Sequence, residues 1–229
     1  DGLTGLTAAG SAEVQLRQVG YCSADGQQVL GNVNATIRAG DRIAITGSSC
    51  SGKSTLLDLL FGLRSPTEGQ ITLLGIDYRE LRLGTLRQHV ALVRDVEVIA
   101  GSVADNVRLG RIQLAGADVR ATLAAVGLLD DILRLPGQLD TPLTSTGRPL
   151  SSTQLRRLML ARACAGSPSL LLLDAALDLF PDHEADALLA WLCRPEHPWA
   201  LLLVTGREAL ANACNRRIAM ECLQSSANS

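Results

Sequence analysis

One short stretch of the chain has residue types and spacings suited to binding phosphate. It runs Gly47-Ser48-Ser49-Cys50-Ser51-Gly52-Lys53-Ser54, matches G-x-x-x-x-G-K-[ST] at every fixed position, and is followed by Thr55. Its glycines let the backbone wrap around a polyphosphate, with N–H groups pointing inward at a helix N-terminus where the dipole favours anions. Lys53 would reach the β- and γ-phosphates, and the Ser54 hydroxyl would bind Mg²⁺. The pattern predicts a nucleoside triphosphate site.

The flanking segments supply the elements that this loop needs. Residues 42–46 form an apolar, strand-like run before the loop, and residues 55–62 follow it as a helix with one apolar face. A strand–loop–helix context is what the motif requires before it can be accepted. The alternative, a chance glycine turn in front of a helix, does not explain both flanks.

Composition limits the classes of protein to which the chain can belong. Its 229 residues suffice for one large domain with a sizeable core, and its net charge of −2 gives no positive footprint for nucleic acid. No apolar run approaches the ~18 residues of a membrane span. The chain starts with Asp1 rather than Met, so we expect a soluble piece of a longer protein. Its six cysteines lack metal-ligand spacing and indicate a reducing, cytosolic environment. Cys50 is either an oxidation-sensitive switch or a tolerated small residue.

The remaining segments alternate between strand and helix patterns. Residues 1–12 are rich in Gly, Ala and Thr and predict a linker, and the domain itself is expected over 13–229. Periodicity predicts strands near residues 13–17, 29–37, 70–74, 90–93, 170–174 and 200–205. Residues 96–135 show helical spacing without a strand signal, and residues 151–165 predict another helix. We therefore expect an α/β fold: a P-loop NTPase core with a parallel sheet, an N-terminal antiparallel β subdomain and an inserted helical subdomain at about 96–165.

Two later segments resemble a known family. Leu150-Ser151-Ser152-Thr153-Gln154, with the arginines and apolar residues that follow, is similar to the signature segment of ATP-binding-cassette (ABC) nucleotide-binding domains. Residues 170–174 fall where that family has its Walker B strand, and the similarity runs from about residue 13 to 223. Phosphate loop, signature and aspartate strand in this order and spacing are specific to the ABC class.

The resemblance implies ligands, partners and a location. The ligands are ATP and Mg²⁺, with Asp174 holding the ion through water and Tyr21 as the candidate aromatic that stacks on adenine. The partners are a second ABC nucleotide-binding domain and the transmembrane domain of a transporter. The ATP bound to that second domain would be faced by the signature residues Ser151, Ser152, Thr153 and Gln154. The location is the cytoplasmic face of the inner (plasma) membrane.

Two stretches are similar to the exporter branch of the family. Residues 101–107 resemble the segment that follows the Q-loop in exporters, and residues 141–147 sit where exporters carry a loop that touches the partner's membrane domain. The usual glutamate of that loop is absent, so an import-type domain stays an alternative.

Positions that the family uses for hydrolysis carry other residues here. Arg94 stands in place of the Q-loop Gln, Ala175 in place of the catalytic Glu, and Gly206 in place of the His that contacts the γ-phosphate. Ser152 and Thr153 replace the two signature glycines. An engineered Glu-to-Ala change would account for Ala175 alone, so we favour natural degeneration. Phosphoryl transfer depends on positioning water and stabilising charge, so we expect ATP to be bound but hydrolysed slowly.

Arg94 allows two interpretations. A guanidinium near the metal position would repel Mg²⁺ and pair with phosphate oxygens, partly replacing the cation. Alternatively, the side chain turns outward and pairs with Asp95 or Glu97.

The sequence as a whole predicts the ATP-binding domain of a bacterial ABC exporter, which couples ATP binding and weak or partner-supplied hydrolysis to transport. One alternative is a non-hydrolysing, regulatory half of an asymmetric ABC pair. Another is a soluble ABC protein outside transport, which the lack of a basic face disfavours. Homodimer and heterodimer both fit this prediction.

Overall fold

The first part of the chain forms an antiparallel sheet, and its first strand begins with alternating buried and less buried side chains. The computed structural model describes residues 13–111 and 113–221, so the predicted linker over 1–12 lies outside the described residues. Strand β1 (Glu13–Cys22) pairs with β2 (Gln28–Arg38) on one side and β4 (Glu68–Leu73) on the other, and β5 (Ile76–Asp77) extends the sheet beyond β4. At the start of β1 every second side chain is buried, as in a strand with one face on the core. The predicted antiparallel subdomain is confirmed.

A parallel sheet forms the centre of the molecule. Its order is β11-β3-β10-β9-β6, and every neighbouring pair is parallel. All five residues of β9 and all five of β10 are buried, as expected for apolar strands covered on both faces. The carboxyl ends of such strands meet at one edge, where ligands bind in open α/β sheets. The strands are β3 (Arg42–Gly47), β6 (Val90–Val93), β9 (Leu170–Asp174), β10 (Ala200–Val204) and β11 (Arg216–Met220).

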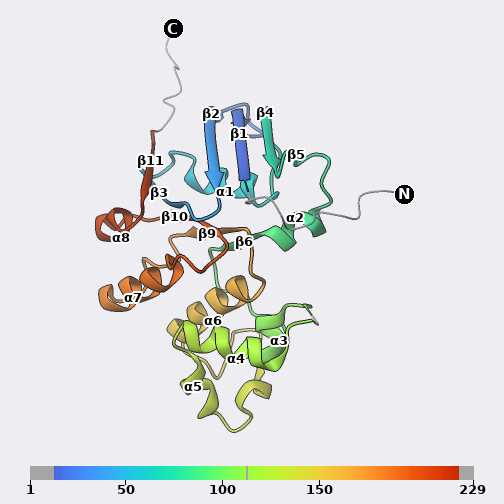
Figure 1. Ribbon diagram of the computed structural model, residues 1–229, viewed down its shortest axis with the longest axis vertical. Coiled ribbons are helices and arrows are strands. Elements are labelled where there is room, and N and C mark those ends of the chain that lie inside the picture. Colours follow the sequence, from blue (N-terminus) through green and yellow to red (C-terminus); the bar gives the residue numbers. More distant parts are fainter. Residues whose placement is uncertain (1–12, 112, 222–229) are drawn as a thin grey trace.

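Helix α1 (Lys53–Leu60) joins the two sheets. Its buried leucines belong to one apolar cluster that also contains side chains of β1, β2, β4, β3 and β10. The other helices of this part of the chain are α2 (Leu83–His89), α7 (Asp182–Leu192) and α8 (Glu208–Asn212). Figure 1 shows α7 and α8 on the side of the parallel sheet away from the antiparallel strands. No helix in the described ranges has the length and apolar character needed to cross a bilayer.

A helical block is inserted between β6 and β9 (Figure 1). Helix α6 packs against α3 and α4 and reaches back to β6, so the block shares its apolar core with one face of the parallel sheet. The block consists of β7 (Gly101–Ser102), α3 (Val103–Arg108), α4 (Gly116–Ala125), α5 (Leu129–Leu133), a 3-10 turn (Gln138–Asp140), β8 (Pro142–Leu143) and α6 (Ser152–Ala165).

The expectation that residues 96–135 contain no strand is wrong. Gly101 and Ser102 form β7 and pair with Leu143 and Pro142 of β8. Two-residue strands are too short to show an alternating pattern. Here Gly101 has a φ of 147°, and Ser102 caps helix α3 by accepting a hydrogen bond from the Asp105 amide. The ladder therefore depends on local backbone geometry and on a loop far away in sequence.

Candidate functional site

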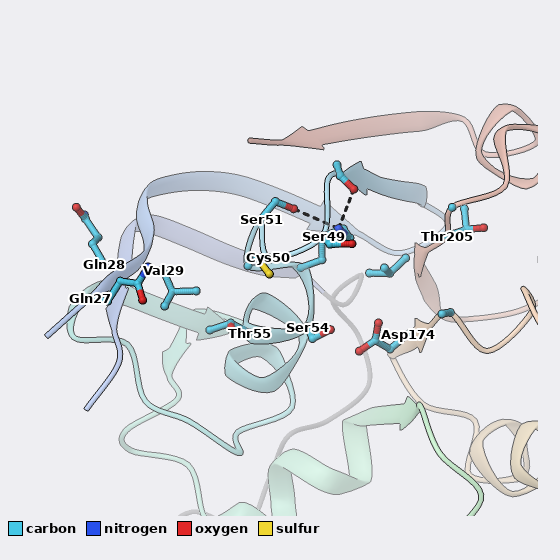
Figure 2. A pocket seen from close by; sticks show the side chains of 16 residues that line it. Gln27, Gln28, Val29, Ser49, Cys50, Ser51, Ser54, Thr55, Asp174 and Thr205 are labelled. Carbon is cyan, nitrogen blue, oxygen red and sulfur yellow. Dashed lines mark hydrogen bonds between the residues drawn. The ribbon is translucent and has the colours of Figure 1, made fainter. Parts of the chain in front are cut away.

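A cavity of about 640 Å³ lies at the carboxyl edge of the parallel sheet. It is lined by the loop after β3, the start of α1, the ends of β9 and β10, and the start of β2 (Figure 2). Every residue of the predicted phosphate loop except Ser48 lines it, as do Thr55 and Asp174. The structure thus gathers residues from four separate strands of the chain around the predicted loop.

The two glycines of the loop cannot be replaced without rearrangement. Gly47 has a φ of 146°, and a Cβ there would lie 2.1 Å from the Met220 carbonyl oxygen of β11. Gly52 has a φ of 84°, and a Cβ there would lie 2.6 Å from a methyl carbon of Leu30. Both backbone conformations favour glycine, and both sites lack room for a side chain. The loop is therefore held tightly between the two sheets.

Lys53 is held inside this loop by oxygen atoms. Its Nζ donates to the carbonyl oxygens of Gly47 at 2.8 Å and Ser48 at 2.5 Å, and to Ser51 Oγ at 3.2 Å. It is the only lysine in the chain. An ammonium group held by two backbone carbonyls and one hydroxyl of the loop is a suitable point charge for a phosphate.

Asp174 ends β9 and faces Ser54 across the cavity (Figure 2). Its side chain is 9% exposed, and its Oδ2 accepts a hydrogen bond of 2.6 Å from Arg94 Nε. The same guanidinium donates from Nη1 to Asp58 Oδ1 at 2.9 Å and from Nη2 to the Ser54 carbonyl oxygen at 3.2 Å. Burial lowers the pKa of Arg94, but hydrogen bonds to Asp174 and Asp58 outweigh this effect and raise the pKa above its usual value. Arg94 is a fixed positive charge here.

Arg94 therefore adopts neither predicted arrangement in full. Its side chain points inward to two aspartates, so the interpretation in which it pairs outward with Asp95 or Glu97 is wrong. It does not line the cavity either, so its contact with a lining side chain is the hydrogen bond to Asp174.

The oxygen atoms of Ser54 and Asp174 are of the type that Mg²⁺ prefers. The net charge of the site does not favour Mg²⁺, because the Arg94 guanidinium already neutralises Asp174, the one carboxylate that lines the cavity. Elsewhere in residues 13–111 and 113–221, no group of three or more His, Cys, Asp or Glu side chains could hold a metal ion. The residues present do not fit an ordinary magnesium site.

The positions predicted to lack hydrolytic groups lie in the cavity wall. Ala175 has a φ of 52°, and its amide donates to the Val204 carbonyl oxygen at 3.0 Å. The Gly206 amide donates to Asp178 Oδ2 at 2.8 Å, and Thr205 Oγ1 donates to Asp178 Oδ1 at 2.5 Å. Neither Ala175 nor Gly206 offers a side chain that accepts or donates a proton. Asp178 holds the end of β10 in place through these two hydrogen bonds, a role that the sequence did not indicate.

The structure does not bring Tyr21 to the cavity. Its hydroxyl accepts a 2.6 Å hydrogen bond from Arg64 Nη1, and the Arg64 guanidinium carbon lies 5.4 Å from the ring centre. Gln27, Gln28 and Val29 line the cavity from the same hairpin instead. No sequence signal marked these three, because their place depends on how the antiparallel sheet sits over the loop.

The predicted signature residues begin helix α6, away from this chain's own cavity. Ser151 is the N-cap: its Oγ accepts from the Gln154 amide at 3.3 Å, while Gln154 Oε1 accepts from the Ser151 amide at 2.8 Å. Gln154 Nε2 also donates to Asp131 Oδ2 at 3.0 Å. Ser152 is exposed and Thr153 half-buried in the first turn. A rigid helix start with an exposed serine is thus presented on the surface of the helical block.

Comparison with known proteins decides the family. The family model described as ABC transporter matches residues 30–178, more than half of the chain. The chain belongs to the ABC transporter family. Membership in this family implies that the loop at the cavity binds ATP.

Relatives and solved structures agree with this assignment. The chain is 33% identical over 184 residues to mouse ATP-binding cassette sub-family B member 6, covering 79% of the chain and 22% of that protein. It is 34% identical over 177 residues to the β-(1→2)glucan export ATP-binding/permease protein NdvA of Mesorhizobium japonicum, covering 77% and 30%. A bacterial Atm1-family ABC exporter with ATP bound matches with a TM-score of 0.84 at 24% identity, over 93% of this chain and 38% of that one. This match confirms the ABC ATPase fold, and the chain spans less than a third of these two curated relatives.

Proposed function

We propose that this chain is the ATP-binding domain of an ABC exporter. It would act at the cytoplasmic face of a membrane, joined to a transmembrane domain and paired with a second nucleotide-binding domain. The names of two similar proteins support the direction of transport: one is a glucan export protein and the other an ABC exporter. The sequence of residues 101–107, which resembles an exporter segment, supports the same branch; these residues form β7 and the capped start of α3.

The composition of the cavity supports ATP binding with slow hydrolysis. Lys53 and Ser54 line the same cavity as Ala175 and Gly206, so binding groups are present where proton-transfer groups are absent. A missing general base costs ~10²–10⁴-fold in rate, and a missing donor to developing charge costs ~10²–10³-fold. The domain therefore binds ATP and turns it over very slowly. Hydrolysis in the working transporter would come from the paired domain.

The same observation favours a second candidate, a regulatory half of an asymmetric pair that never hydrolyses ATP. ATP binding by this domain would not depend on magnesium, because Arg94 already neutralises Asp174.

Titration with a fluorescent ATP analogue, together with steady-state phosphate release, tests this function. We expect saturable binding that Lys53→Ala weakens about 10–100-fold, the range for losing a charge-assisted hydrogen bond. Arg120→Ala is the matched control, because it removes one positive charge from the exposed surface of α4. An unmodified chain that releases phosphate at about one per second or faster, within the usual range for enzymes, would contradict slow turnover. Unaltered binding in Lys53→Ala would contradict the site itself.

A further inference from the structure

We propose that Arg94 replaces the divalent cation at this site, so that the domain binds ATP without needing magnesium. This inference rests on the proposed function, because it concerns the same nucleotide site. It assigns to the chain's own guanidinium the charge-neutralising role that a metal ion would otherwise fill at Asp174.

The position of Arg94 is fixed by three acceptors from two elements, β9 and α1. Nε binds Asp174 at the end of β9, Nη1 binds Asp58 of α1, and Nη2 binds the Ser54 carbonyl oxygen in the first turn of α1. The carboxylates are 9% and 12% exposed, and Arg94 itself is 30% exposed. The planar guanidinium of Arg can donate to two carboxylates at once and neutralise their charge. A Gln at this position could donate a hydrogen bond but would leave the charge of the carboxylates uncompensated.

The charges around Asp174 cancel without a metal ion. Asp58 Oδ2 also accepts from Arg64 Nε at 3.0 Å, so two aspartates are paired with two arginines. A divalent ion added at Asp174 would meet a neutral cluster and the repulsion of a nearby guanidinium. Removing Arg94 would leave the cluster with one net negative charge, which attracts a cation.

A metal ion at this site would depend on Asp174 for negative charge. Of the described residues that line the cavity, Asp174 is the only one with a carboxylate, and Lys53 is the only one with a cationic side chain. An Arg94 that merely stabilised the fold would still occupy this carboxylate.

The experiment measures how much Mg²⁺ tightens nucleotide binding. The full chain and Arg94→Gln are each titrated with a fluorescent ATP analogue, once with EDTA and once with millimolar MgCl₂. We expect Mg²⁺ to change the affinity of the unmodified chain less than about threefold, while the affinity of Arg94→Gln rises at least about tenfold, in the range by which residues around a metal site alter affinity or activity. Arg120→Gln, which also removes one arginine, should behave like the unmodified chain.

The outcomes separate this inference from the proposed function. Absence of binding under both conditions would contradict the ATP-binding function. Binding with equal Mg²⁺ dependence in the unmodified chain and Arg94→Gln would overturn the role of Arg94 alone. Circular dichroism checks that the variant folds. Should it not fold, the unmodified chain still decides: tenfold tighter binding with Mg²⁺ overturns the proposal, and unchanged affinity supports it.

Discussion

Ala175 and Gly206 are the residues at which ATP hydrolysis should be recoverable. A Cβ on Gly206 would meet only Asp178 Oδ2, at 3.7 Å, an ordinary contact, so a larger side chain can enter there. We expect Ala175→Glu and Gly206→His each to raise turnover less than about tenfold, and the double variant to exceed the product of the two. Groups that act as one unit in phosphoryl transfer are strongly non-additive. Steady-state phosphate release from the four proteins is the measurement, and a double variant equal to that product would contradict the idea.

Single residues were predictable where their role depends on near neighbours in sequence. Lys53 and Ser54 are identified by spacing within one loop, and the structure places both in the cavity wall. Asp58, Arg94 and Asp174 come from three distant segments, and only the order of the strands brings them together. The sequence identified Arg94 as unusual but could not show which carboxylates it binds.

At the scale of elements, the capping box at the start of α6 is a stability determinant. Ser151→Ala removes the acceptor for the Gln154 amide, and losing such a cap costs about 1 kcal/mol. We expect a lower midpoint in urea unfolding with an unchanged slope. Ser152→Ala, one residue later, is the control: Ser152 is exposed inside the first turn, where alanine is the better helix former. Equal destabilisation by both changes would show that the cap contributes nothing specific.

Long periodic elements followed from the sequence, and short ones did not. The predicted strand over 170–174 coincides with β9, and the predicted helix over 151–165 corresponds to α6, because burial on the sheet or on one helix face imposes a clear period. The two-residue strands β7 and β8 have no period to detect and owe their pairing to the packing of the helical block.

For the whole molecule, the position of the signature segment is the informative feature. Ser151 and the start of α6 lie on the helical block, while the phosphate loop lies at the edge of the parallel sheet. A helix N-terminus favours anions, yet this one is absent from the lining of its own chain's cavity. An arrangement of this kind has a use when each signature faces the ATP held by another domain.

We therefore expect the chain to dimerise when ATP is bound and to be monomeric without it. The proposed slow turnover should make the dimer long-lived, since the nucleotide between the two domains would persist. Light scattering at high protein concentration, with and without saturating ATP, measures the mass directly. Lys53→Ala, which should bind ATP about 10–100-fold more weakly, should stay largely monomeric at an ATP concentration that just saturates the unmodified chain, whereas Arg120→Ala should dimerise like the unmodified chain. A strict monomer in saturating ATP would contradict a role for Ser151 across the interface, and a dimer of equal strength without ATP would show an interface that does not depend on the nucleotide.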